Sequence, residues 1–250
     1  MITQQQIGNF LIPFPSLSEQ TAIATILSDM DALIDSLDQL IAKKRALKQG
    51  AMQQLLTGKT RLSGFIGEWE TKRLGDLVDC FDSARIPLNE AQRAGMQGQY
   101  PYCGANGILD YVNDYVLDDD VILIAEDGGY FDEYTHRPIA YRMSGKIWVN
   151  NHAHVLKARI GVSQGFLFYS LVHKNILSYL ASGTRAKLNK SEMNKIEVSL
   201  PLHLAIQERI ATVLSDMDAE IVTLEQKRDK TRALKQGMMQ ELLTGKTRLI

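Results

Sequence analysis

Two nearly identical segments, 187 positions apart, constrain the fold of this chain more than any other feature. Residues 24–32 read ATILSDMDA and residues 211–219 read ATVLSDMDA. Residues 45–62 read RALKQGAMQQLLTGKTRL and residues 232–249 read RALKQGMMQELLTGKTRL. The common offset makes them parts of one repeat of roughly 45 residues without internal gaps, and a repeat of this kind governs how a chain folds. A repeated segment on each side of an unlike middle predicts a symmetric frame that holds one inserted domain.

Both copies of the repeat have the apolar spacing of a long amphipathic helix. Apolar residues recur at steps of three and four from residue 17 to about residue 57, and the second copy repeats this spacing. Near-heptad stripes of this kind favour a two-helix coiled coil. The residues expected to form the coiled coil and to dock partner proteins are Ile26, Met30, Leu33, Leu37, Leu40 and Leu47 in the first copy and Val213, Met217, Ile221, Leu224 and Leu234 in the second.

The charges predict that the two helices run antiparallel. Acidic residues gather in the first half of the first copy (Asp29, Asp31), and basic residues gather in its second half (Lys44, Lys48). An antiparallel pair places the acidic half of each helix beside the basic half of the other, which is favourable. A compact middle segment also requires its two ends to lie close together, which gives the same direction.

The segment between the repeats predicts a mixed α/β globular domain, so the chain as a whole is expected to be α+β. Short apolar runs at 121–125, 139–141 and 147–149 alternate with Gly, Asn and Asp, which is typical of strands and turns. Residues 165–180 have helical spacing. The expected divisions are an arm at 1–16, a helical region at 17–62, the globular domain at 63–201 and a second helical region at 202–250.

The arm at 1–16 has two interpretations. Residues 7–15 (IGNFLIPFP) loosely resemble residues 193–201 (MNKIEVSLP), the exit of the globular domain. This likeness favours the last strand of a domain that the chain does not carry. The alternative is an ordinary N-terminal arm.

Composition narrows the functional classes. There is no run of about 18 apolar residues, so no membrane span is expected. The N-terminus lacks the basic and apolar regions of a secretory signal, which favours a cytoplasmic protein. Cys80 and Cys103 are too few for a disulfide framework or a metal knuckle. The net charge of −1 predicts weak non-specific affinity for DNA, because a chain that neutralises many phosphates alone is usually basic.

The motifs for nucleotide or metal binding are incomplete. The GKT triplets at 58–60 and 245–247 lack a glycine five positions earlier, and each follows a helix where a phosphate loop follows a strand. His152 and His154 alternate along an expected strand and so point to one face, but no third metal ligand is evident. A glycine-rich cofactor loop and a Pro-based catalytic motif, which a DNA methyltransferase would need, are both missing.

Acidic residues leave a nuclease as one alternative. Asp118 and Asp119 precede Asp120, and Glu126 and Asp127 follow one strand later. Such carboxylates can hold Mg²⁺, but no lysine follows Glu126 at the short spacing that a metal-dependent nuclease uses. A hydrated turn before the strand accounts for them as well.

Polar, planar and aromatic side chains are concentrated in the middle domain. Arg, Asn and Lys can read base edges, while Thr, Lys and backbone amides can hold phosphates. The alternative is a surface whose charges are merely hydrated. The residues expected to contact DNA are Asn106, Asn113, Tyr115, Arg137, Arg142, Asn151, His152, Thr184, Arg185, Lys187, Asn189 and Lys190.

These features together resemble the specificity (S) subunit of type I restriction-modification systems, over essentially the whole chain. The resemblance is carried by YPYCGANGILDY at 100–111, GKIWVNNHAHVLKA at 145–158, the GTRAKLNKSEMNKIEVSLP segment at 183–201 that leads into IQERIATVLSDMDAEI, and the repeated helix ends. It implies a DNA-reading domain between helical regions. Each such domain reads half of a split target, and the helices act as a spacer.

The same resemblance implies partners rather than catalysis by this chain. The helices would dock two methyltransferase (M) subunits, which methylate adenine N6 with S-adenosylmethionine. A restriction (R) subunit would add cleavage that depends on ATP and Mg²⁺. No cofactor is expected in this chain, and its own ligand would be double-stranded DNA.

The chain departs from the family pattern because it has one DNA-reading domain where a full subunit has two. This predicts a halved or truncated subunit, which would reach two readers by pairing with a second copy or another half-subunit. Two rival hypotheses remain: a coiled-coil adaptor whose middle domain binds protein, and a nuclease that uses Asp120, Glu126 and Asp127.

Overall fold

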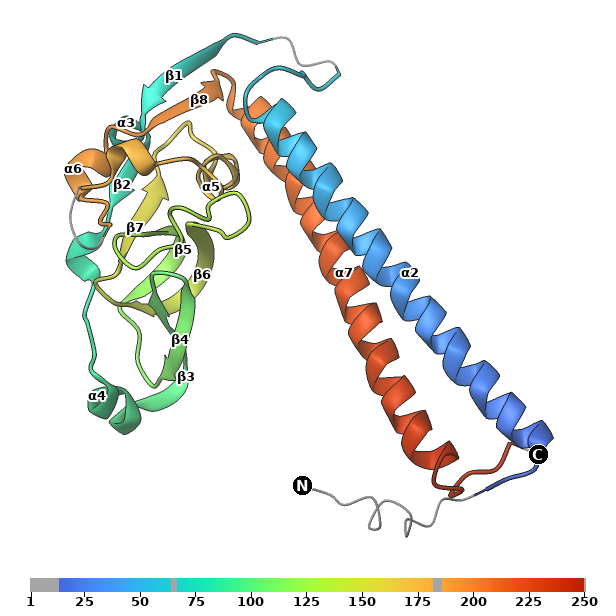
Figure 1. The fold of residues 1–250 in the computed structure, drawn as a ribbon. Helices are drawn as coiled ribbons and strands as arrows, with labels where there is room; N and C mark the ends of the chain where they lie inside the picture. The colour runs from blue at the N-terminus through green and yellow to red at the C-terminus, as the bar shows by residue number, and fades with distance from the viewer. Residues whose placement is uncertain (1–13, 64–66, 182–185, 250) are drawn as a thin grey trace. The chain divides into compact units, whose positions relative to one another are not determined.

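The computed structural model describes residues 14–63, 67–181 and 186–249. The chain divides into two compact units, one of residues 1–49 with 216–250 and one of residues 50–215. Nearly all of the expected arm at 1–16 lies outside the described residues. The elements are α2 (Leu17–Leu55), β1 (Trp69–Arg73), α3 (Leu74–Leu77), β2 (Val78–Cys80), η1 (Asp82–Ala84), α4 (Glu90–Gly95), β3 (Gln97–Gly104), β4 (Gly107–Val112), β5 (Leu117–Ala125), β6 (Ala140–Val149), β7 (Ala153–Ala158), α5 (Gln164–Leu171), η2 (Leu177–Tyr179), α6 (Lys190–Met193), β8 (Glu197–Pro201) and α7 (Leu204–Leu242). Figure 1 labels the α-helices and β-strands.

The helical unit is an antiparallel pair of α2 and α7, which lie side by side in Figure 1. Lys48 Nζ lies 2.5 Å from Asp218 Oδ1, and Asp31 is paired with Lys235. The partner's number rises along α7 as the residue number falls along α2, which is the signature of antiparallel packing. The acidic half of each helix therefore lies beside the basic half of the other, and the prediction of direction is confirmed.

The ion pairs between the helices follow the internal repeat. Subtracting 187 from the Lys235 position gives Lys48, and adding 187 to the Asp31 position gives Asp218, so these two pairs are copies of one another. The pairs Arg45–Glu225 and Asp38–Arg232 are related in the same way. The coiled coil therefore has an internal two-fold relation.

The contact between the helices repeats strictly every seven residues. Its buried positions in α2 include Ile34, Leu37 and Ile41, which are the first and fourth positions of successive heptads. Of the residues expected to form the coiled coil, Leu37 and Ile221 are buried, while Ile26, Met30, Val213, Met217 and Leu224 are half-buried.

Four of the residues expected to form the coiled coil or to dock partner proteins lie outside the contact between the two helices. Leu33, Leu40, Leu47 and Leu234 are 41%, 38%, 51% and 57% exposed. Each precedes a first heptad position by one residue, which turns its side chain onto the flank of the pair. Steps of three and four along a sequence do not separate the contact line from its flank.

The second unit is built on a six-stranded sheet with the order β2-β7-β5-β6-β3-β4. Among the strands of the described residues, only the β3–β6 pairing is parallel, and a separate two-stranded sheet joins β1 to β8. The VILIA run at 121–125 is fully buried as the second half of β5, because both faces of this central strand are covered. The expected helical segment at 165–180 forms two pieces, α5 and η2. The mixed α/β fold flanked by two long helices is confirmed.

Among the helices in the described ranges, none is both long and apolar enough to cross a membrane.

Candidate nucleic-acid interface

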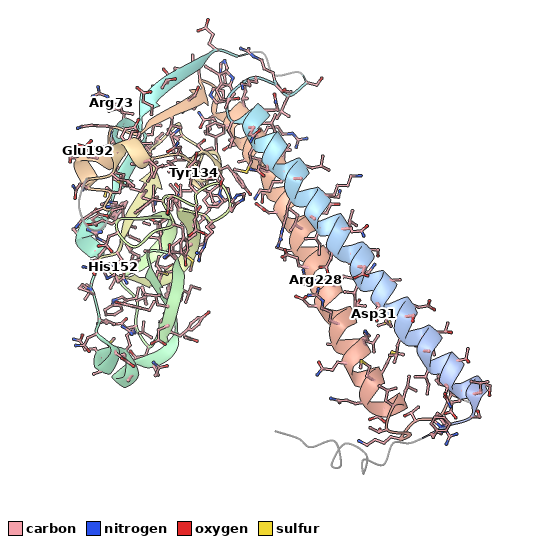
Figure 2. All side chains as sticks on the ribbon, in the orientation of Figure 1. Asp31, Arg73, Tyr134, His152, Glu192 and Arg228 are labelled. Atoms are coloured by element: carbon pink, nitrogen blue, oxygen red, sulfur yellow. The ribbon has the colours of Figure 1, made fainter. Side chains whose placement is uncertain are left out.

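Three of the segments expected to contact DNA meet at residues 126–128, directly after strand β5. The Asn106 amide nitrogen, from the β3–β4 turn, donates to the Gly128 carbonyl at 2.9 Å. His152 Nδ1 lies 2.7 Å from Asp127 Oδ1. We call residues 126–128, which directly follow β5, the hub of the site; His152 is labelled in Figure 2.

Lys187 is the third side chain at the hub. Its Nζ lies 2.9 Å from Glu126 Oε1, and its backbone forms a β-bridge with Asp127. The next residue, Leu188, donates its backbone N–H to the Glu126 carbonyl at 2.7 Å. The chain after residue 185 is therefore fixed to the same strand end as Asn106 and His152.

A largely buried network of charged side chains contacts the residues of the hub. Arg85 Nη1 lies 2.6 Å from Glu126 Oε2. His154 is buried, with Nδ1 2.7 Å from Asp82 and Nε2 donating to the Leu188 carbonyl at 2.8 Å. These contacts join η1, β7 and the segment after residue 185 to one another.

The network also sets the charge of its carboxylates. Burial alone would raise the pKa of Asp82, but the hydrogen bond and charge of His154 lower that pKa to about 2. Burial likewise opposes ionisation of Glu126, yet hydrogen bonds from Lys187 and Arg85 bring its pKa below the usual value. Both acids are therefore anionic at neutral pH and hold the basic residues in place.

A second cluster lies near the start of β5. The rings of Tyr100 and Tyr115 pack edge to face, with centroids 5.3 Å apart, and Lys146 Nζ lies 4.5 Å from the Tyr115 centroid. Lys146 pairs across the sheet with Asp118, one residue into β5, whereas the hub follows the last residue of that strand. Asn113 is exposed two positions before Tyr115. The expected contact residues are thus split between two places.

Two of the expected arginines already have anionic partners. Arg142 holds Asp120 through two nitrogens, one of them at 2.7 Å. Asp120 precedes Glu126 by six residues, so this pair lies roughly 20 Å from the hub along the strand. Arg137 lies over the Tyr130 ring, 3.1 Å from its centroid, and 3.5 Å from Glu133. Arg142 therefore lies away from the hub, whereas Arg137 is held over Tyr130, two residues after Gly128.

The remaining expected residues lie at or near the hub in sequence. Asn151 is exposed next to His152, and Asn189 and Lys190 are exposed at the start of α6, just after Leu188. Thr184 and Arg185 lie outside the described residues.

The carboxylates proposed for a nuclease are not gathered in one place. Asp120 is engaged by Arg142 and Glu126 by Arg85 and Lys187, while Asp127 Oδ1 lies 2.7 Å from His152 Nδ1. Asp120 and Glu126 thus already have cationic partners, which offset the charge that would attract Mg²⁺. This arrangement argues against a nuclease site built from these residues.

The residues that come nearest to a metal-ligand set are Cys80, Asp82 and His154, whose ligand atoms lie within 4.8 Å of one another. Both ring nitrogens of His154 already have partners. Burial raises the pKa of the Cys80 thiol, which disfavours the thiolate that binds metals. This geometry fits a structural network better than a metal centre. His152 and His154 were expected to point to one face; His154 is buried, whereas His152 is half-buried.

Sequence reasoning overlooked the supporting residues. Arg85 and Asp82 gave no signal, because their partners lie tens of positions away along the chain. Lys146 lies more than 30 positions from Tyr100 and Tyr115 in the sequence, and its position near both rings follows only from the pairing of the strands.

Comparison with known proteins is consistent with this geometry. The family model for the type I restriction modification DNA specificity domain matches residues 1–44 and 66–232. A putative type I restriction enzyme specificity subunit of Haemophilus influenzae is 35% identical over 159 residues, covering 63% of this chain and 39% of the relative. The type I restriction enzyme MjaVIII specificity subunit of Methanocaldococcus jannaschii is 28% identical, covering 96% of this chain and 63% of the relative.

Solved structures share the fold. The S subunit of a type I restriction-modification system from M. genitalium matches with a TM-score of 0.67 at 18% identity, covering 91% of this chain and 61% of the other. The specificity subunit from Thermoanaerobacter tengcongensis matches with a TM-score of 0.53 at 17% identity, over 98% and 63% of the two chains. The chain thus spans between about two fifths and two thirds of the length of these proteins. By the family match and the shared fold, it belongs to the family of type I restriction-modification DNA specificity subunits.

Proposed function

We propose that this chain is a non-catalytic DNA-sequence-specificity subunit whose middle unit reads one half of a bipartite target. One observation carries the proposal. Three segments that are distant in sequence present an amide, an imidazole and an ammonium group, from Asn106, His152 and Lys187, around one strand end. Asparagine can pair with adenine edges, and lysine with guanine or phosphate.

The pairing of the basic groups at the hub explains how a near-neutral chain could still be selective. Lys187 is held by Glu126, and His152 lies against Asp127. DNA phosphates must displace or share these carboxylates, so binding to arbitrary DNA gains little. A correct base sequence adds directional hydrogen bonds, and the partner subunits supply further positive charge.

We further propose that each long helix docks one methyltransferase subunit. Residues 46, 49, 50 and 53 are exposed on the back of α2, and the same residue types recur, also exposed, at 233, 236, 237 and 240 on α7. A coiled coil does not require identical residues on its outer face. Gly50 and Gly237 are especially telling, because helical glycines are costly and no other group lies within 4 Å of a Cβ built at either position. Two equal surfaces fit two copies of one partner whose backbone approaches closely.

In this assembly the cofactors belong to the partners. S-adenosylmethionine would be bound by the methyltransferase (M) subunits, and ATP with Mg²⁺ by the restriction (R) subunit. The complex would act on double-stranded DNA, and a cytoplasmic location suits that substrate.

The DNA proposal is tested by selection of sequences from a randomised duplex pool with the complex of this chain and its methyltransferase subunits. The wild-type complex is expected to enrich one half-site. K187A is expected to weaken binding about tenfold, since one lost specific contact costs ~1–3 kcal/mol. K72A is the matched control, because Lys72 and Lys187 are both 45% exposed and both paired with a glutamate. A complex that enriches no sequence would overturn DNA readout and leave the adaptor hypothesis.

The docking proposal is tested by bulky substitutions at the two glycines. G50W and G237W are each expected to reduce the number of bound methyltransferase subunits from two to one, and the double variant to none. Native mass spectrometry gives this stoichiometry directly. L17W, at an exposed end of α2, is the control for an added surface tryptophan.

A further inference from the structure

Three apolar side chains are exposed along β4, the strand at one edge of the six-stranded sheet. Ile108, Leu109 and Tyr111 are 45%, 60% and 49% exposed. Among the described strands, β4 pairs only with β3, beside which it lies in Figure 1. The carboxylate of Asp110 is already paired with Arg93, at 3.2 Å. An apolar edge strand without unpaired charges is a liability unless a binding partner covers it.

This edge strand begins beside the hub. Asn106, which donates to the Gly128 carbonyl, immediately precedes the first residue of β4. Leu109 follows Asn106 by three residues, so the two are at most about 10 Å apart along the chain. Neighbouring base pairs are about 3.4 Å apart in DNA, so a duplex held at the hub would place both side chains within one half-site.

Hydrogen bonds hold the turn that joins β3 to β4. The Tyr141 hydroxyl donates to the Gly104 carbonyl and lies 3.3 Å from the Gly107 carbonyl. Burial raises the pKa of this hydroxyl, so it remains a donor at neutral pH. Asn106 adds its bond to Gly128. The turn is thus held at residues 104, 106 and 107, and β4 presents its side chains from a preorganised position.

A β-bulge sets Leu109 apart from its neighbours in β4. Consecutive residues of β3 pair with Ile108 and Asp110, so Leu109 has no partner opposite it. Bulges re-aim side chains and are frequent next to functional sites. The Leu109 side chain lies over Gly104, because a Cβ built on that glycine would come within 2.5 Å of Leu109 Cδ1. Leu109 is therefore seated on the backbone of the turn, and it is still the most exposed of the three apolar residues of β4.

We infer that Leu109 contacts the 5-methyl group of a thymine in the major groove of the target half-site. The inference rests on the proposed function, because it assumes that the second unit reads DNA. The major groove admits a two-stranded β-ribbon such as β3–β4, and only thymine carries a methyl group there. Apolar side chains recognise this methyl group by direct contact. Leu109 thus adds an apolar determinant for a T·A pair to the polar groups of the hub.

Protein contact is the alternative role for this strand, and its closeness to the hub favours DNA. A methyltransferase subunit that covered Leu109 would also crowd Asn106, three residues earlier. That subunit would then block a side chain proposed to read bases. A duplex in contact with Asn106 can reach Leu109 without such a conflict.

Replacement of thymine by uracil tests the contact one methyl group at a time. Deoxyuridine keeps the base pair and the O4 acceptor and lacks only the 5-methyl group. Once selection has given the half-site for the complex of this chain with its methyltransferase subunits, each thymine is replaced singly, and dissociation constants are measured by fluorescence anisotropy. The wild-type complex is expected to bind about fourfold more weakly at one such position, which is the effect of one buried methyl group.

The variants assign this effect to Leu109. L109A is expected to bind the unmodified half-site at least fourfold more weakly and to bind the thymine and uracil duplexes equally. L109M keeps an apolar side chain of similar size, so it is expected to retain the discrimination. I160A is the matched control for an exposed apolar residue, because Ile160 follows the far end of β7, roughly 20 Å along that strand from His152. It should bind both duplexes as the wild type does.

Three results would overturn the inference. One is an enriched half-site that has no thymine, or in which every thymine tolerates uracil. Another is an L109A complex that keeps the wild-type discrimination. The third is an L109A complex that has lost a methyltransferase subunit in native mass spectrometry, which would assign β4 to protein contact. Each of these leaves DNA readout standing, whereas a complex that enriches no sequence overturns the proposed function and this inference together.

Discussion

At the scale of single residues, the surface groups of the site depend on a buried pair beneath them. Asp82 faces His154 Nδ1, and His154 Nε2 donates to the Leu188 carbonyl next to Lys187. The folded pKa of Asp82, about 2, is below the 3.8 of an unperturbed aspartate. A depressed pKa contributes stability that is fully present above the unfolded value and is lost as pH falls through the folded value.

The pH dependence of stability tests this pair. The wild-type chain is expected to lose about 2 kcal/mol of unfolding free energy from Asp82 between roughly pH 4 and pH 2, from the pKa difference. D82N removes the ionised partner of His154, so it is expected to be less stable at pH 7 and to show a shallower decline below pH 4. Urea unfolding at a series of pH values measures both. D132N, at an exposed aspartate, should follow the wild-type curve; an unchanged D82N curve would contradict the account.

The chemistry of single side chains predicted some residues of the site, but it did not predict how those residues are arranged. Asn106, His152 and Lys187 were expected to contact DNA because of their side chains, and the structure brings them to one strand end. Arg142 carried the same expectation, but it is occupied by Asp120 on a neighbouring strand. Such pairings arise from the sheet register, and local sequence does not encode that register. Arg85 was missed for the same reason, since its partner Glu126 lies 41 positions away.

At the scale of elements, the repeat predicted the two helices and their direction, because matching stripes and opposed charge gradients leave few alternatives. The repeat did not separate the residues of the contact between the helices from the exposed leucines on its flank. That distinction depends on a rotation of one position around the helix, and the burial of Leu37 against the exposure of Leu40 reveals it.

Charge exchange tests the direction of the helices. K48D or D218K alone is expected to lower the unfolding free energy by roughly 0.5–1 kcal/mol, as for partly exposed ion pairs. The double variant K48D/D218K restores the attraction in the antiparallel register and should recover most of the loss. Thermal unfolding followed by circular dichroism checks this, with K59D, beyond the end of α2, as control. Additive losses in the double variant would contradict the pairing.

The helical glycines give a second prediction at this scale. G50A and G237A are each expected to raise the unfolding free energy of the free chain by about 0.5–1 kcal/mol, since alanine favours the helix and the space is open. G58A is the contrast, because Gly58 has φ of +68° and a Cβ there would lie 3.0 Å from the Trp69 ring. A loss of stability in G58A with a gain in G50A is the expected pattern in chemical denaturation. No gain in G50A would show that the isolated chain itself needs that glycine.

At the scale of the whole molecule, two helices with an internal repeat flank one inserted unit, in a chain that spans at most about two thirds of its relatives. The frame holds the shared, repeated residues, and the inserted unit holds the groups expected to read DNA. The DNA sequence that the complex prefers should therefore depend on the inserted unit and not on the helical frame.

Transfer of the insert tests this division most directly. Residues 69–201 are replaced by the corresponding segment of the M. genitalium S subunit, whose fold matches, and the complex with the original methyltransferase subunits selects from a randomised duplex pool. The account predicts that the complex still assembles and that the enriched half-site changes from the original to that of the donor. An assembled complex that enriches the original half-site would contradict it.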